Sequence, residues 1–161
     1  MRILGIDPGT SRIGYGFIET NGLKLIRYGV IEAKEKTLAE KIVNFSGQLE
    51  KLVGDLNPEL AAIEKLYFAK NQKTAIDVAQ ARGVILSLLL KRNILIREYS
   101  PNEVKSNITG YGLADKKGVA KMVKAILKIN ELPGYDDASD ALAIAITAAN
   151  HLRVNGGVDR E

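Results

Sequence analysis

Four acidic residues stand where apolar structure would otherwise be continuous. Asp7 ends the run Ile-Leu-Gly-Ile, Glu64 ends the run Leu-Ala-Ala-Ile, and Asp137 and Asp140 open an alanine-rich segment. Removing an unpaired charge from water costs several kcal/mol, so acids at the edge of a core indicate that a positive group gathers them. A pair of divalent metal ions is the natural candidate.

The composition narrows the choice of metal. The chain has no cysteine and a single histidine, His151, which excludes thiolate sites and multi-histidine zinc sites. Carboxylate oxygens remain, and they prefer hard cations such as Mg²⁺ or Mn²⁺. Two Mg²⁺ ions roughly 4 Å apart can activate a water and stabilise a leaving oxygen, which hydrolyses a phosphodiester without histidine or a covalent intermediate.

Each acid also has a simpler interpretation. Asp7 could be a turn residue, and acids in the first turn of a helix are stabilised by the helix dipole by roughly 0.3–1 kcal/mol. Glutamate is a poor turn former, which favours a site at Glu64. On a helical wheel, Asp137 and Asp140 share an apolar face, whereas Asp136 lies to one side. We therefore expect Asp137 and Asp140 to face inward.

The net charge of +4 is concentrated in one segment. Within residues 101–130, the lysines outnumber the acids by four, which equals the net charge of the whole chain. These lysines are Lys105, Lys116, Lys117, Lys121, Lys124 and Lys128. The last four are spaced by four, three and four residues, so a helix would align them in one stripe. This is typical of a surface that binds a polyanion, although a solvated helix face would give the same pattern.

Apolar runs, turn residues and helical spacing predict the elements that position these side chains. Strands are expected at 2–6, 14–19, 23–33, 59–64 and 94–99, with a hairpin turn at Asn21-Gly22. Helices are expected at 38–56, 71–92, 115–129 and 136–153, with a short helical turn after Pro101. The order of these elements predicts an α/β fold.

Length and composition suit one domain over residues 1–153, followed by a C-terminal tail at 154–161, because 161 residues with 46% hydrophobic content can bury a full core. No run of about 18 apolar residues is present, and Asp7 interrupts the first one, so we expect a soluble, cytoplasmic protein. The segment from Val84 to Leu90 is apolar on nearly all sides. It predicts a homodimer through the helix around Asn71–Arg92, although burial within one chain would also explain it.

Short motifs follow one another along the chain. They are Gly5-Ile6-Asp7-Pro8-Gly9-Thr10, Gly14-Tyr15-Gly16, Ala62-Ile63-Glu64, Ala69-Lys70-Asn71, Ala79-Gln80-Ala81-Arg82-Gly83 and the run from Asp137 to Ala145. In this order and spacing, the chain resembles the RuvC-type Holliday-junction resolvases of bacteria, which are small nucleases with the ribonuclease H-like fold. The resemblance covers nearly the whole chain. It implies a five-stranded mixed sheet, an antiparallel meander followed by two parallel strands, flanked by helices.

The resemblance also implies roles for individual residues. The catalytic acids and ligands of two Mg²⁺ ions, with Mn²⁺ able to substitute, would be Asp7, Glu64, Asp137 and Asp140. Some family members carry histidine at the Asp137 position, where this chain keeps a carboxylate. Lys105 and Lys116 match lysines that are important for cleavage. Together with the lysine stripe, the resemblance predicts nucleic-acid contacts at Tyr67, Phe68, Lys70, Asn71, Arg82, Lys117, Lys121 and Lys124, with Tyr67 or Phe68 stacking on a base.

The implied activity is the symmetric nicking of two opposed strands of a four-way DNA junction by a homodimer, in homologous recombination and DNA repair. The RuvA–RuvB branch-migration complex is an implied partner. A nuclease of the same fold acting on RNA or RNA–DNA hybrids would use the same acids. An actin-like ATPase or sugar kinase would need a second domain, for which the length leaves no room. An inert junction-binding module would be expected to lack the acids.

Overall fold

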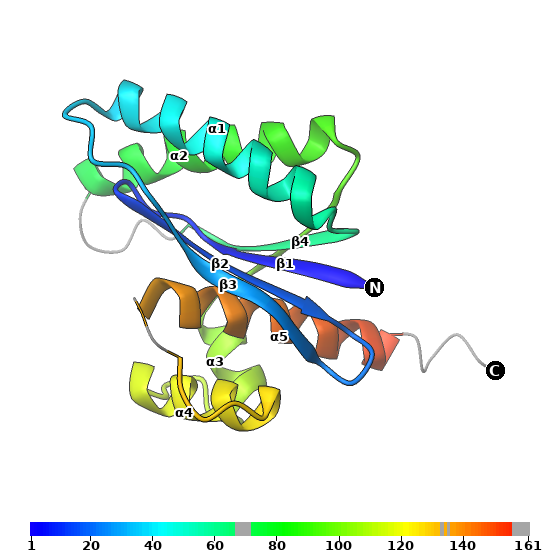
Figure 1. Ribbon diagram of the computed structural model, residues 1–161. Coiled ribbons are helices and arrows are strands. Elements are labelled where there is room, and N and C mark those ends of the chain that lie inside the picture. Colours follow the sequence, from blue (N-terminus) through cyan, green and yellow to red (C-terminus); the bar gives the residue numbers. More distant parts are fainter. Residues whose placement is uncertain (67–71, 133, 135, 156–161) are drawn as a thin grey trace.

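The computed structural model describes residues 1–66, 72–132, 134 and 136–155. Within them, the strands form one mixed sheet with helices on both faces (Figure 1). The strands are β1 (Arg2–Asp7), β2 (Arg12–Glu19), β3 (Lys24–Glu32), β4 (Leu60–Glu64) and β5 (Leu95–Tyr99), in the spatial order β3-β2-β1-β4-β5. β2 pairs antiparallel with β1 and β3, whereas β4 pairs parallel with β1 and β5. The expected meander and parallel pairs are confirmed.

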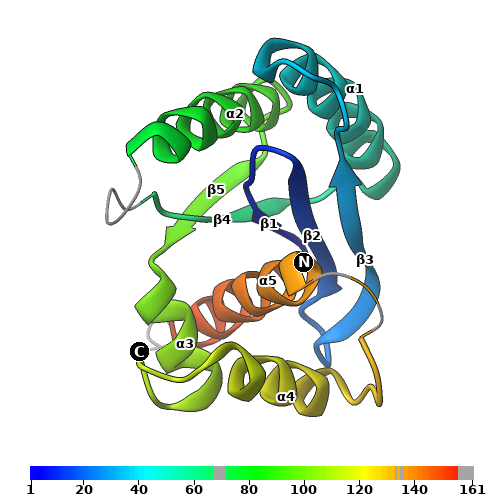
Figure 2. The ribbon, with the colours of Figure 1, turned by 90° about the vertical axis from the view of Figure 1, so that its left-hand side faces the viewer.

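The helices build layers on this sheet. α1 (Leu38–Leu56) and α2 (Gln72–Lys91) cover one face, and α5 (Asp136–Asn155) covers the other (Figure 1). α3 (Pro101–Thr109) and α4 (Lys116–Leu127) lie on the side of α5 away from the sheet (Figure 2). α5 is therefore enclosed, and every residue from Ala141 to Ala149 is buried. No helix in the described part of the chain is long and apolar enough to cross a membrane.

α3 and α5 are longer than the helices expected from the sequence. Ser100 and Glu103 form a capping box, and Pro101 occupies the first turn. The chain after β5 therefore forms a nine-residue helix, α3, where the sequence predicts only a short turn. α5 ends at Asn155 rather than at residue 153. The rest of the expected tail, 156–161, lies outside the described residues.

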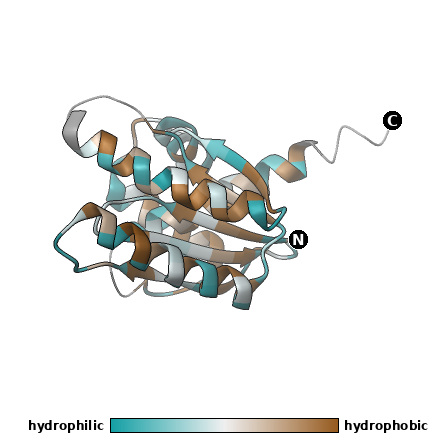
Figure 3. Cartoon of the chain, turned by 90° about the horizontal axis from the view of Figure 1, so that it is seen from above, coloured by the Kyte–Doolittle hydropathy of each residue, from teal (hydrophilic) through white to brown (hydrophobic). Residues whose placement is uncertain are grey.

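Only part of the apolar surface of α2 is left for a partner. Ala81, Ile85 and Leu89 are buried in the core between the sheet and the outer helices. Ile76 and Leu90 are 55% and 61% exposed. Figure 3 shows hydrophobic and hydrophilic residues alternating along the helices on this side. Burial within the chain thus accounts for one side of the helix, and a second chain could cover the other.

Candidate active site

The alternation of side chains along a strand turns two acids toward α5. Successive side chains point to opposite faces, so Asp7 lies on the same face as Ile3. By the same rule, Glu64 lies on the face of Ala62. Ile3 and Ala62 both belong to the core cluster that contains the buried residues of α5. Because β1 and β4 are parallel neighbours, their two terminal acids meet at one edge of the sheet.

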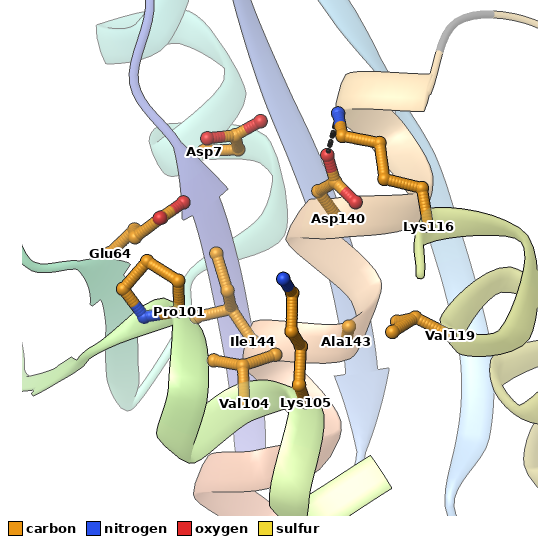
Figure 4. A pocket seen from close by; sticks show the side chains of 10 residues that line it. All are labelled: Asp7, Glu64, Pro101, Val104, Lys105, Lys116, Val119, Asp140, Ala143 and Ile144. Carbon is orange, nitrogen blue, oxygen red and sulfur yellow. Dashed lines mark hydrogen bonds and ion pairs between the residues drawn. The ribbon is translucent and has the colours of Figure 1, made fainter. Parts of the chain in front are cut away.

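Asp140 joins these two acids from the start of α5. The three carboxylates lie around one cavity of about 290 Å³ (Figure 4). Two lysines and an apolar wall complete the lining, and these residues are Lys105, Lys116, Pro101, Val104, Val119, Ala143 and Ile144. In Figure 4, the amine of Lys105 points upward into the space between Glu64 and Asp140. The structure therefore brings together three predicted acids and both predicted catalytic lysines.

Glycines in the sheet let α5 approach closely enough to bring its acids beside those of β1 and β4. A Cβ atom at Gly5 of β1 would overlap the backbone carbonyl oxygen of Ala141. A Cβ atom at Gly14 of β2 would overlap the carbonyl oxygen of Asp137. Side chains at either position would push the first turns of α5 away from the strands. These contacts give a physical reason for the Gly-Ile-Asp and Gly-Tyr-Gly motifs.

The electrostatics of the cavity are dominated by mutual repulsion. Burial, as the largest cause, and repulsion from the nearby carboxylates of Glu64, Asp140 and Asp137 together raise the pKa of Asp7 from 3.8 to about 8. Burial also raises the pKa of Glu64, with a second contribution from Asp140, while a hydrogen bond with Asp7 acts in the opposite direction. With a pKa of about 8, Asp7 is largely protonated at neutral pH in the protein without a bound metal ion. The site therefore has a strong electrostatic preference for added positive charge.

Lys116 already supplies one positive charge. Its Nζ donates to Oδ2 of Asp140 at 3.0 Å (Figure 4). This hydrogen bond raises the pKa of Lys116. The lysine side chain is 69% exposed and that of Asp140 is 28% exposed, so the pair lies at the mouth of the cavity. Lys116 could therefore reach either the acid or a phosphate.

Asp137 is placed differently from the other three acids. Its Oδ2 lies 3.0 Å from Nε of Arg12, at the start of β2. Both residues line a second hollow of about 470 Å³, together with the turn between β1 and β2. Asp137 is still close enough to raise the pKa of Asp7. Sequence reasoning missed Arg12, because neither periodicity nor a turn motif marks a basic residue as the partner of an acid more than one hundred positions away.

Known proteins of one family resemble this chain over most of its length. The family profile described as "Crossover junction endodeoxyribonuclease RuvC" matches residues 3–148. The chain belongs to the RuvC family. The crossover junction endodeoxyribonuclease RuvC of Petrotoga mobilis is 49% identical over 156 residues, covering 95% of this chain and 96% of that protein.

Solved structures of RuvC have the same fold. The chain superposes on a structure of Thermus thermophilus RuvC with a TM-score of 0.87 at 30% identity, covering 96% of this chain and 97% of that one. The T. thermophilus RuvC in complex with a Holliday junction substrate gives a TM-score of 0.89 at 30% identity, covering 96% of both chains. The expected ribonuclease H-like fold is therefore confirmed over nearly the whole chain.

The acids of this RuvC family member fit a divalent metal by chemistry, but two of the four are paired with basic side chains of the protein. Four carboxylates from three elements would offer an all-oxygen donor set of the kind that a hard cation prefers. In residues 1–66, 72–132, 134 and 136–155, no three acidic or histidine side chains form a ready-made ligand set for one ion. Asp137 and Asp140 are held by Arg12 and Lys116. In a metal-bound form, these two carboxylates would share their oxygens between the ion and their basic partners, or would leave those partners.

The remaining predicted residues fall into three groups. Lys117 and Lys121 are exposed on α4 and Lys124 is partly exposed, while Val119 and Val123 on the other side of that helix are buried. Arg82 does not lie on the open surface, because its side chain is only 15% exposed. The other predicted nucleic-acid contacts, Tyr67, Phe68, Lys70 and Asn71, lie outside the described residues.

The stability of the metal-free protein should fall as pH rises, because the pKa of Asp7 is higher in the folded chain, at about 8, than its ordinary value of 3.8. Between these values the folded state holds a proton that the unfolded state has lost, which costs up to about 1.4 kcal/mol of stability per pH unit. Asp7→Asn should remove this loss and be several kcal/mol more stable than wild type at pH 8 in chelator. Urea unfolding at several pH values between pH 4 and pH 9 measures the free energy of unfolding of both proteins. If the free energies of the two proteins changed with pH in parallel, the prediction would be wrong.

Proposed function

We propose that this chain is a structure-specific endonuclease that resolves four-way DNA junctions by hydrolysing phosphodiester bonds. The observation that carries the proposal is the gathering of Asp7, Glu64 and Asp140 with Lys105 and Lys116 around one cavity. Membership of the RuvC family supports DNA junctions as the substrate, in preference to RNA or hybrid duplexes. We further propose that residues 1–153 form a single nuclease domain acting in the cytoplasm, where bacterial DNA lies.

The proposed chemistry follows from the side chains in the cavity. Two Mg²⁺ ions, replaceable by Mn²⁺, would be held by Asp7, Glu64, Asp137 and Asp140, and would supply an activated water and charge stabilisation for the leaving oxygen. Lys105 points into the cavity, where it would contact the scissile phosphate. Lys116 would hold Asp140 until DNA binds and then share its charge with the phosphate. The apolar wall would restrict the water that reaches the bond.

A homodimer would place two such sites on one junction. Resolution requires cuts in two opposed strands, which a twofold pair of sites delivers symmetrically. We propose the partly exposed side of α2 as the dimer contact, since it presents the exposed apolar side chains of Ile76 and Leu90 and leaves the cavity open. The RuvA–RuvB branch-migration complex is the proposed partner in recombination and repair, by family resemblance.

The lysine stripe of α4 should add to DNA affinity. If Lys121 and Lys124 contact phosphates, the variant with both changed to glutamine should lower the slope of log affinity against log salt by roughly 0.9 per lost contact. Fluorescence anisotropy of a labelled junction in 50–300 mM salt measures the slope. Lys51→Gln on the opposite outer layer is the matched control. An unchanged slope in the double variant would show that the stripe is a solvated helix face that does not contact DNA.

Substrate choice tests the proposed function. Labelled four-way junctions, linear DNA duplexes and RNA–DNA hybrids would each be incubated with the protein in Mg²⁺ or in chelator. The proposal predicts metal-dependent, paired nicks in the junction alone. Cleavage of the hybrid in preference to the junction would instead assign the four acids to a ribonuclease activity, and binding without cleavage would make the chain an inert junction-binding module.

A further inference from the structure

Arg82 of α2 contacts the backbone of one of the acids. Its Nε donates to the carbonyl oxygen of Glu64 at 3.3 Å. Its guanidinium also forms an ion pair with Glu98 of β5. The arginine side chain is 15% exposed and that of Glu98 is 40% exposed. Nε and one terminal nitrogen of the guanidinium are thus directed at groups of the protein.

The direction of this contact separates Arg82 from the cavity. On β5, Glu98 shares the face of Ile96, which packs against the core on the α1 and α2 side. The side chain of Glu64 lies on the opposite face, toward α5 and the cavity. Arg82 therefore reaches Glu64 from behind the sheet. A DNA strand in the cavity would meet the carboxylate of Glu64 and not the guanidinium of Arg82.

We propose that Arg82 is a positioning residue for Glu64 and not a contact to DNA. This inference rests on the proposed function, because it assigns Arg82 to the same site. Glu64 is the last residue of β4, and its pairing with Tyr99 is the last step of the β4–β5 ladder. Arg82 ties this strand end to α2 and, through Glu98, to β5. The carboxylate of Glu98 supplies the counter-charge that allows a guanidinium to be largely buried there.

A positioning role and a DNA contact predict different defects. If Arg82 holds Glu64 in place, Arg82→Gln should lower the single-turnover cleavage rate at saturating enzyme by about 10- to 100-fold, since small misplacements of a reacting group have effects of this size. The affinity for the junction and its salt dependence should stay unchanged. Mg²⁺ binding to the DNA-free protein, measured by calorimetry, should weaken. Glu98→Gln should also lower the cleavage rate and weaken Mg²⁺ binding. Arg82→Lys should cleave faster and bind Mg²⁺ more tightly than Arg82→Gln.

The matched control is Arg92→Gln. Arg92 directly follows the last residue of α2. Its guanidinium pairs with the carboxylate of Glu50 on α1 at 3.4 Å, and both side chains are exposed. Its loss should leave cleavage and Mg²⁺ binding unchanged. Thermal melting of all variants tests for general damage, and Arg82→Lys and Glu98→Gln carry the test if Arg82→Gln does not fold.

Three results would overturn the inference. Weaker junction binding with a smaller salt slope and a normal rate would make Arg82 a DNA contact. Normal cleavage and normal Mg²⁺ binding in Arg82→Gln would show that Glu64 needs no such support. Equal losses in Arg82→Gln and Arg92→Gln would reduce the effect to general destabilisation. The calorimetric measurement uses no DNA, so it gives an answer even if wild-type protein fails to cut junctions and the proposed function is wrong.

Discussion

Replacing Asp7 with asparagine is expected to lower the rate of junction cleavage by about 10³-fold or more, with junction binding retained. The carboxylates of Glu64, Asp137 and Asp140 all raise the pKa of Asp7, which places Asp7 within reach of the whole charge cluster. Asparagine keeps the shape but removes the charge that a divalent ion would need. Glu64→Gln, at the end of the neighbouring strand, is expected to behave in the same way.

Single-turnover cleavage and anisotropy on the same labelled junction measure these two quantities separately. Asp55→Asn is the matched control, because Asp55 is exposed on α1 across the sheet. It should cut and bind as wild type does. Normal cleavage by Asp7→Asn and Glu64→Gln would place the active site elsewhere. Loss of binding together with cleavage would mean that these acids support the fold or the DNA surface instead.

Adding one methyl group at Gly5 is expected to destabilise the protein by about 3 kcal/mol or more, or to prevent folding. The new Cβ would overlap the carbonyl oxygen of Ala141 in an enclosed helix, where the backbone has little room to move. Gly14→Ala should have a similar effect through the carbonyl of Asp137. Variants that still fold should lose cleavage, because the displaced helix carries Asp137 and Asp140.

Gly47→Ala provides the opposite expectation. Gly47 lies within α1, and a Cβ there would meet no atom within 4 Å. Alanine is a better helix former than glycine by about 1 kcal/mol, so this variant should be slightly more stable than wild type. Urea unfolding compares the three variants. If Gly5→Ala were as stable as Gly47→Ala, the close packing of α5 on the sheet would not be what positions the site.

The strand-terminal acids could be predicted because local rules decide their position. Asp7 and Glu64 follow apolar strands, and the pairing of parallel neighbours brings their ends together. The exposure of Lys117 and Lys121 could be predicted from helical spacing, since Val119 and Val123 lie on the buried side of α4. In each case the pattern within one element was sufficient.

Contacts between distant elements were not predictable in this way. The pairing of Arg12 with Asp137 depends on how α5 meets β2, which a single sequence does not reveal. The same holds for Arg82, where a basic residue in a motif suggests a DNA contact, but its neighbours in space are Glu64 and Glu98. For both arginines, the partner is identified only by the packing of elements that are distant in the sequence.

Anomalous diffraction from crystals of the protein grown with Mn²⁺ tests the two-metal centre directly. We expect two Mn²⁺ peaks about 4 Å apart in the cavity beside Asp7, with Glu64 and Asp140 as ligands and Asp137 released from Arg12. Repeating the measurement on Asp7→Asn should abolish at least one peak. Peaks only at other acids, or an empty cavity with both ion pairs intact at saturating Mn²⁺, would contradict the claim that these carboxylates form a two-metal nuclease centre.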